Sequence, residues 1–452
     1  MLIWIGSLRA FTVNLGWLIL RISLALGILA LLFLSQRFWF RALWRMTAAW
    51  GSKVFRVAAR LIYVVALLLV ILATYDGIRA GHGQIIPRGT MVTALAGLWY
   101  FSALLSYLAV KLVHTFDYIW RLTKRKLRKT DPALQPAAAQ IDIVPNPSRR
   151  YFFQTATAAA GAAPFLTAVY GFAAERLNYQ IRRVEVPVAN LPQQLDGMTV
   201  AQLSDIHLSG YMPRAQVRRA IDMANGLNAD LAVVTGDFIT GAGDSIADCI
   251  SEVRRLQAPL GVWGCNGNHE IYAGFEGEAQ RLFARNGMKL LRHESAQIQF
   301  RGASINMIGV DYQRERTPSG RKLQMLDGVD ELVRKDMPNF LLSHNPNTFN
   351  RAAELGIELS LAGHTHGGQV QVEILDHRLS PARFITDYVA GHYTRPLFEA
   401  ARSEASGHFI AANMLQRPSA TLYVNRGLGT VGAPVRLGVP PEITLLTLRS
   451  AS

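Results

Sequence analysis

The stretch TVAQLSDIH, residues Thr199–His207, decides the fold class of this chain. Five largely apolar residues, the length of a buried strand, lead directly into Asp205 and His207. In α/β proteins, functional side chains collect in the loops beyond the carboxyl ends of strands. The stretch therefore predicts a strand with a site at its end, although a single Asp-x-His pair is weak evidence.

The same arrangement recurs four more times along the chain. Each later apolar run ends in a loop that carries Asp, Asn or His, often beside Gly, and these loops are Gly236-Asp237, Gly267-Asn268-His269-Glu270, Ser343-His344-Asn345-Pro346 and Gly363-His364-Thr365-His366. Strand-like runs at 305–310, 421–425 and 443–448 continue the alternation with helix-compatible stretches. Residues 175–452 are therefore predicted to form one mixed α/β domain.

The side chains at these strand ends predict a metal site. Two carboxylates, one amide oxygen and four imidazoles suit Mn, Fe, Zn or Co better than Ca or Mg, which prefer oxygen ligands alone. Seven ligands exceed what one tetrahedral ion takes, but they suit two ions that share a carboxylate. Two such ions can bridge a hydroxide and bind the oxygens of a phosphoryl group.

These motifs, in this order, resemble those of the calcineurin-like metallophosphoesterases over about residues 197–448. The segments Asn425–Gly429 and Gly438–Ile443 look like the bacterial membrane-anchored branch, the transmembrane proteins with a metallophosphoesterase domain. The resemblance implies a four-layer α/β/β/α sandwich. It also implies a phosphodiesterase-like hydrolase that cleaves a phosphodiester or pyrophosphate by in-line attack of a metal-bridging hydroxide.

The resemblance also implies a role for each matching residue. Three residues would hold the first metal, three the second, and one carboxylate would bridge both; in that order they are Asp205, His207 and His366, then Asn268, His344 and His364, and finally Asp237. His269 would contact the phosphate or protonate the leaving oxygen. Substrate contacts are expected from Asn268, His269 and Arg426, although single arginines such as Arg426 and Arg436 more often make structural hydrogen bonds. Glu270 would orient a neighbouring histidine or form a surface salt bridge.

The net charge of +15 does not indicate a nucleic-acid binder. The whole excess lies in residues 1–174, which hold 19 basic and 4 acidic residues, while residues 175–452 hold 28 of each. Because the predicted catalytic domain is neutral, a phosphate-backbone surface has no electrostatic support. The basic residues instead flank apolar stretches, as topology signals do beside membrane helices.

Four stretches have the length and composition of membrane spans: Phe11–Leu34, Leu61–Tyr75 extended back to Val57, Met91–Val110 and Phe152–Phe172. The predicted organisation is a membrane region at 1–130, a cytoplasmic linker at 131–150, a signal or anchor helix at 151–174 and the catalytic domain at 175–452. Lys and Arg in the first and third connections place those loops in the cytoplasm. We therefore expect a multi-pass protein of the bacterial inner membrane with an extracytoplasmic catalytic domain.

Ser148-Arg149-Arg150-Tyr151-Phe152 and the Ala-rich run that follows resemble a twin-arginine export signal, which would make the export machinery a partner. An ordinary helix with two flanking arginines is the alternative, and cleavage after the run stays open. A membrane tether makes a lipid-linked phosphate a plausible substrate.

Two other functions compete with this interpretation. One is a cytoplasmic-facing pyrophosphatase of nucleotide-activated lipid precursors, and the other is a non-catalytic metal-binding sensor. Cys249 and Cys265 are expected to be buried thiols, with a single disulfide as the alternative. The connection between Gln369 and Thr421 carries several aromatic residues and is either a lid or lipid contact, or an ordinary packed insertion.

Overall fold

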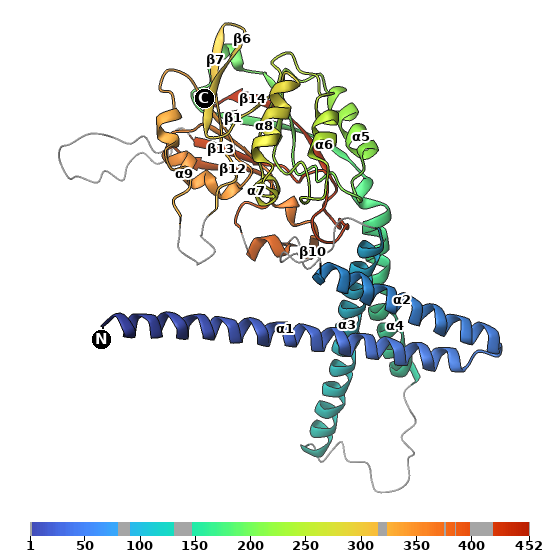
Figure 1. Cartoon of the computed structure of the whole chain (residues 1–452). Coiled ribbons are helices and arrows are strands. Elements are labelled where there is room, and N and C mark those ends of the chain that lie inside the picture. The colour runs from blue at the N-terminus through green and yellow to red at the C-terminus, as the bar shows by residue number, and fades with distance from the viewer. Residues whose placement is uncertain are drawn as a thin grey trace, which may run out of the picture. The chain divides into compact units, whose positions relative to one another are not determined.

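The structure is a computed structural model that describes residues 2–79, 91–130, 147–314, 323–374, 377–384, 386–397 and 419–451. The chain divides into two compact units (Figure 1). The first comprises residues 1–87 and 92–169, and the second comprises residues 88–91 and 170–452. Each unit is described separately below.

The first unit is helical at all four stretches for which membrane spans were predicted. Its helices are α1 (Leu2–Ala48), α2 (Lys53–Arg79), α3 (Met91–Thr130) and α4 (Pro147–Ala173), the last of which continues into the second unit. The described residues contain two helical segments apolar and long enough to cross a membrane, Leu26–Ala48 and Arg150–Leu177. The other two spans, and the orientation derived from four of them, stay predictions.

Helices of the first unit contact one another through a glycine and aromatic rings. The Trp39 indole N–H donates to the carbonyl of Ala103 at 3.0 Å, and its ring lies 5.6 Å from that of Phe165. A Cβ atom on Gly161 would lie 3.5 Å from Trp39, in ordinary van der Waals contact. Small residues of this kind let helices approach closely.

The second unit contains two mixed six-stranded sheets. The first has the order β1-β14-β2-β3-β4-β5, with bounds Gln180–Val188, Glu442–Ser450, Thr199–Leu203, Leu231–Thr235, Val262–Cys265 and Lys289–Leu290. The second has the order β12-β13-β9-β8-β7-β6, with bounds Gly391–Pro396, Ser419–Val424, Leu359–Ala362, Asn339–Leu342, Ala303–Gly309 and Glu294–Phe300. A separate hairpin joins β10 (Val372–Ile374) to β11 (His377–Leu379).

Alternating side chains on the central strands build two apolar layers. In β3, Leu231 and Val233 pack between the two sheets, whereas Ala232 and Val234 belong to the core under the helices. This is the period-two alternation of a strand buried on both faces. The helices that cover the first sheet are α5 (Arg214–Asn225), α6 (Ile246–Val253) and α8 (Glu276–Arg285) (Figure 1).

The outer face of the second sheet is covered by α9 (Phe349–Glu354), whose Phe349 packs against Leu422 and Val424 of β13. The layers are thus helix, sheet, sheet and helix, which confirms the predicted α/β sandwich. Cys249 and Cys265 are both buried and free, so the expectation of two buried thiols is confirmed.

The described part of the connection from Gln369 to Thr421 packs as an ordinary insertion. The Tyr388 ring is buried and lies 5.5 Å from Phe349 and 5.1 Å from Tyr393. Residues 398–418, which include Phe398 and Phe409, lie outside the described residues.

Candidate metal centre

Parallel pairing brings the predicted site loops to one edge of the two sheets. Strands β2, β3 and β4 pair in parallel in the first sheet, and β8 and β9 pair in parallel in the second. Their carboxyl ends therefore lie on common edges, and the loops that follow carry the seven predicted ligands. The short helix α7 (Asn268–Ala273) follows β4 and positions Asn268 and His269.

Two groups of potential metal ligands meet at this edge. Asp205, His207 and His366 offer ligand atoms within 4.8 Å of one another, and the same holds for Asp237, His344 and His364. In the first group, His366 Nε2 lies 3.3 Å from Asp205 Oδ1 and 3.2 Å from His207 Nε2. These separations suit atoms that share one ion.

Asp237 belongs to the second group and also lies close to the first. Its Oδ2 atom is 3.4 Å from His207 Nε2 of the first group and 3.0 Å from His344 Nε2 of the second. Asn268 is buried, and its Oδ1 atom has no hydrogen-bond partner in the described part of the chain. A buried carbonyl oxygen without a donor is costly unless a cation satisfies it, so this atom fits a metal ligand.

Backbone carbonyls fix the tautomers of three histidines. The Nδ1 atoms of His207, His344 and His269 lie 3.1, 2.6 and 2.6 Å from the carbonyls of Ile239, Thr235 and Thr240 respectively. A carbonyl can only accept, so each Nδ1 carries a proton, and each Nε2 lies on the side of its ring that faces away from the carbonyl. This is the outer hydrogen bonding that orients metal-bound imidazoles.

The chain is similar to known proteins over the region that carries these potential metal ligands. Residues 198–368 match the family described as calcineurin-like phosphoesterase. The chain contains a calcineurin-like metallophosphoesterase domain.

Three relatives each align with 60–68% of this chain. The chain is 29% identical over 284 residues to the transmembrane protein with metallophosphoesterase domain of Bos taurus, covering 60% of this chain and 57% of that protein. It is 28% identical over 312 residues to the metallophosphoesterase YkuE of Bacillus subtilis, covering 68% and 99%. It is 27% identical over 327 residues to UDP-2,3-diacylglucosamine pyrophosphatase LpxG of Chlamydia trachomatis, covering 63% and 94%. The chain thus spans just over half the length of the bovine relative.

Strained backbone supports the ligands of the phosphoesterase domain. Five of the seven have a positive φ, with values between 48° and 73°, namely Asp205, His207, Asp237, His364 and His366. Residues other than Gly rarely adopt this conformation, and it persists only where the surroundings enforce it, as at functional sites. Nothing local in the sequence predicted this feature.

Two glycines are required by close packing against the carboxylates. A Cβ atom on Gly267 would lie 2.1 Å from Asp237 Oδ1, and one on Gly363 would lie 2.3 Å from Asp205 Oδ2. Real atoms do not approach so closely, so any larger residue would displace the carboxylate that it meets. The glycines next to the ligand motifs therefore determine where the ligand oxygens lie.

Glu270 has a role that neither sequence interpretation anticipated. Among the described residues it forms no salt bridge and no hydrogen bond to a histidine: its buried carboxylate accepts hydrogen bonds from the backbone N–H groups of Asp237, Phe238, Ile239 and Gly267 at 2.9, 2.8, 3.3 and 2.9 Å. Burial and the nearby Asp237 raise the pKa of Glu270 to about 7, while the N–H donors favour its ionised form. Glu270 thus joins the two loops that carry Asp237 and Asn268.

Opposing effects set the protonation of the candidate ligands. Burial raises the pKa of Asp205. Burial also acts to raise that of Asp237, but His344 and His207 hold the pKa of Asp237 well below its usual range. Burial would lower the pKa of His344, yet Asp237 and Asp205 raise it to about 10, whereas burial lowers the pKa of His364 to about 3. Asp237 is therefore the ionised carboxylate between the two groups.

The two arginines of the closing loop differ in their surroundings. The Arg426 Nε atom lies 3.4 Å from Glu442 Oε2, so its charge faces a carboxylate. Arg436 is fully buried and donates hydrogen bonds to the carbonyls of Arg426, Gly427, Gly429 and Val439. The expectation of structural hydrogen bonding fits Arg436, and substrate binding by Arg426 stays a prediction.

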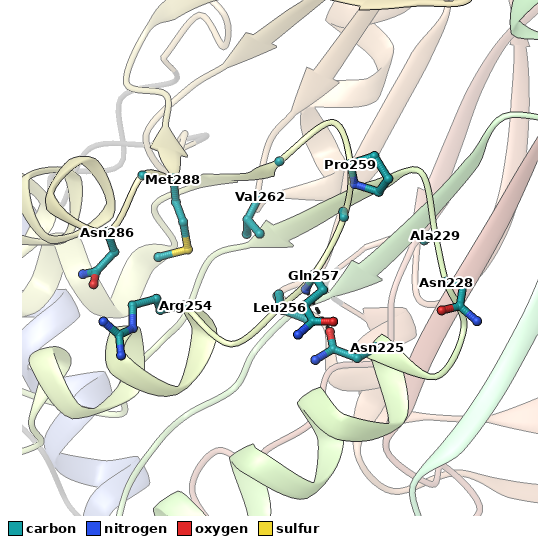
Figure 2. Close-up of a pocket in the computed structure, with 13 residues that line it drawn as sticks. Asn225, Asn228, Ala229, Arg254, Leu256, Gln257, Pro259, Val262, Asn286 and Met288 are labelled. Carbon is teal, nitrogen blue, oxygen red and sulfur yellow. Dashed lines mark hydrogen bonds between the residues drawn. The ribbon is translucent and has the colours of Figure 1, made fainter.

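A separate pocket of about 560 Å³ lies at the opposite ends of the strands (Figure 2). Its lining includes Ala229, Gly261 and Met288, which lie one or two residues before β3, β4 and β5 respectively. Asn225, at one side, accepts from the backbone N–H of Gln257 and donates to a backbone carbonyl. The carboxyl-end loops with their ligands do not line this pocket, so it is distinct from the candidate centre.

Proposed function

We propose that this chain is a membrane-anchored phosphoesterase with two divalent metal ions, which hydrolyses a phosphodiester or a pyrophosphate. The observation that carries the proposal is the position of Asp237 Oδ2, 3.4 Å from His207 in one ligand group and 3.0 Å from His344 in the other. A carboxylate oxygen close to an imidazole of each group fits a bridging ligand of a dinuclear site.

The residues fit the proposed ions by chemistry as well as by position. Asp205, His207 and His366 would hold one ion, and Asn268, His344 and His364 the other, with Asp237 shared. Two such ions, once bound, would lower the pKa of a coordinated water and neutralise charge on a phosphoryl group. Mn, Fe, Zn or Co all suit this mixture of nitrogen and oxygen donors.

His269 is suited to move a proton at the leaving oxygen. Its backbone N–H donates to Asp237 Oδ1 at 2.9 Å, and its Nδ1–H is held by Thr240, so Nε2 lies toward the centre, 4.0 Å from Asp237 Oδ2. Burial lowers the pKa of His269, and a bound anionic phosphoryl group would favour its protonated form. A protonated Nε2 could then donate to the departing oxygen.

A lipid-linked substrate and an extracytoplasmic site are further parts of the proposal. The relative from Chlamydia trachomatis is named as a pyrophosphatase of a diacylated nucleotide sugar, and the bovine relative is named as transmembrane. Within the described residues, the segment Arg150–Leu177 can cross a membrane and leads directly into the catalytic unit. Export through the twin-arginine machinery, suggested by Arg149 and Arg150, is the least supported part.

A cytoplasmic-facing pyrophosphatase shares the chemistry and differs only in its side of the membrane. Alkaline phosphatase fused after residue 180 separates the two in a bacterial host, because the reporter is active only outside the cytoplasm. An active fusion supports the extracytoplasmic site, and an inactive, stably expressed fusion supports the cytoplasmic alternative.

Hydrolysis of bis(4-nitrophenyl) phosphate by the full chain in detergent tests the activity. We expect turnover that depends on added Mn²⁺, disappears with a chelator and falls at least a hundredfold in Asp237→Asn, because this substitution removes the shared charge. Asp248→Asn, at an exposed carboxylate of α6, is the matched control and should keep full activity. Bound metal without turnover of any phosphate ester would favour the non-catalytic sensor.

A further inference from the structure

Two tyrosines beside the second ligand group form a strip that the proposed mechanism leaves unused. The Tyr312 ring centroid lies 5.3 Å from that of His364 and 6.2 Å from that of His344. The Tyr272 ring lies 6.3 Å from Tyr312 and 6.3 Å from His269. The strip therefore begins at candidate metal ligands and ends beside the proposed proton donor.

Arg314 adds a positive charge to the outer end of the strip. Its guanidinium carbon lies 4.9 Å from the ring centroid of Tyr272, which is 58% exposed. Among the described residues no carboxylate pairs with Arg314. An arginine stacked on an aromatic face is restrained by the ring while its N–H donors stay available to an anion.

The phenol groups supply further donors at the same place. Burial raises the pKa of Tyr312, so its hydroxyl keeps its proton at neutral pH and can donate a hydrogen bond. Two hydroxyls and a guanidinium together suit a phosphate oxygen better than an acyl chain, because an acyl chain would leave these polar groups unpartnered.

We propose that Tyr272, Tyr312 and Arg314 form a subsite for the second phosphate of a pyrophosphate diester, which makes P–O–P bonds preferred over phosphodiesters whose leaving group carries no phosphate. This proposal rests on the proposed function, since the subsite serves a substrate whose first phosphate lies at Asp237. It selects one of the two substrate classes that the metal centre alone leaves open.

The reaction balances with water as the only co-reactant. The water oxygen forms a new bond to the first phosphorus, and the bond from that phosphorus to the bridging oxygen breaks. The bridging oxygen leaves on the second phosphate with the electron pair. One water proton goes to solvent, and His269 supplies a proton to the leaving oxygen and regains one from water. Because negative charge grows on the second phosphate, Arg314 contributes more as the bond breaks.

Paired substrates and paired variants test the subsite in the full chain with Mn²⁺. The pyrophosphate diester is a nucleoside diphosphate sugar, and the comparison substrate is bis(4-nitrophenyl) phosphate. We expect Arg314→Gln to lower kcat/KM for the pyrophosphate diester about tenfold, or 1.4 kcal/mol, and to change that for the aryl diester less than twofold. Arg314→Lys should restore part of the loss because it keeps the charge.

The control is Arg301→Gln, because Arg301 also stacks on an aromatic ring, with its guanidinium carbon 4.7 Å from the centroid of Phe300, but follows β6, away from the ligand loops. It should leave both substrates unaffected. Equal loss on both substrates in Arg314→Gln, or no loss on either, would overturn the subsite while leaving the phosphoesterase intact.

If neither substrate is hydrolysed, the proposed function is contradicted, and a binding measurement still tests the subsite. Calorimetry measures the affinity of the manganese-loaded chain for a methylene-bridged diphosphonate diester, which has two anionic phosphorus groups, and for methylphosphonate, which has one. A tenfold weaker affinity of Arg314→Gln for the diphosphonate alone supports the subsite. Unchanged affinity for the diphosphonate overturns it.

Discussion

Replacing Arg436 by Met tests how the loop behind the first ligand group is held. The buried guanidinium donates to four carbonyls, three of which belong to residues 426–429. That loop in turn holds the ligand backbone, since Gly429 N–H donates to the Asp205 carbonyl at 2.7 Å and Leu428 N–H donates to that of Ser204 at 3.0 Å. Arg436 therefore acts on Asp205 without touching the ligand atoms.

The expected free-energy cost follows from two opposing effects. Four buried carbonyls lose their donor, which costs about 1–2 kcal/mol each, or about 4–8 kcal/mol together. The folded state no longer buries a guanidinium, whose pKa burial lowers from 12.5 to about 10, and this returns about 3 kcal/mol. The net loss of unfolding free energy is about 3 kcal/mol, which lowers Tm by roughly 6–12 °C.

Calorimetric melting and manganese titration of Arg436→Met measure both consequences. We expect the lower Tm together with weaker binding of one of two ions, because only the first ligand group is backed by this loop. Arg449→Met is the control, since Arg449 forms an exposed pair with Glu185 and should leave the Tm unchanged. Unchanged Tm and unchanged metal affinity in Arg436→Met would refute the reasoning.

Three further substitutions and one truncation extend the account. Glu252 pairs with Arg218 and Arg214, which lower its pKa from 4.5 to about 2 in the folded state. The stabilisation from this carboxylate is therefore present above pH 4.5 and is lost as pH falls toward 2. Because the two arginines are half-exposed, we expect Glu252→Gln to remove about 1–2 kcal/mol of the acid dependence of stability measured in thermal melts. Glu270→Gln should lower kcat at least tenfold, because an amide cannot accept from all four loop N–H groups, and a normal kcat would contradict that. Gly363→Ala should lose one of two ions in metal analysis, since its Cβ would lie 1.9 Å from the Ser204 hydroxyl oxygen. A catalytic unit that begins at residue 178 should have a lower Tm than one that begins at residue 165, since the Gly171 carbonyl accepts from the Arg436 backbone N–H at 3.3 Å. Equal Tm values would show that the end of α4 does not stabilise the Arg436 loop.

The fold was largely predictable because each central strand is a short apolar run with a polar ending. The strand at Thr199–Leu203 was predicted with the bounds that the structure has, and the predicted run at 443–448 lies within β14. In such strands, alternating side chains fill the two apolar cores, so the strand pattern can be recognised from a few consecutive residues. The pairing of β13 beside β9, and of β14 between β1 and β2, depends on contacts between distant segments and could not be derived from such runs.

The residue types of the candidate site could be predicted from the sequence, but the hydrogen bonds that hold those residues in place could not. Histidine, aspartate and asparagine at strand ends can be recognised as potential metal ligands from their side chains alone. The role of Glu270 depends on N–H groups more than 30 residues earlier, and the positive φ of Asp205 depends on Gly429, more than 200 residues later. The strip from Tyr312 to Tyr272 likewise brings together residues from two separate loops.

Metal content measured together with turnover tests the central claim most directly. Purified full chain, loaded with Mn²⁺ and freed of excess metal, should contain two ions per chain when it hydrolyses bis(4-nitrophenyl) phosphate at full rate. Asp237→Asn should lose both the second ion and the activity, because its carboxylate lies between both ligand groups. A fully active chain with one ion, or an Asp237→Asn variant with two ions and normal turnover, would contradict the account.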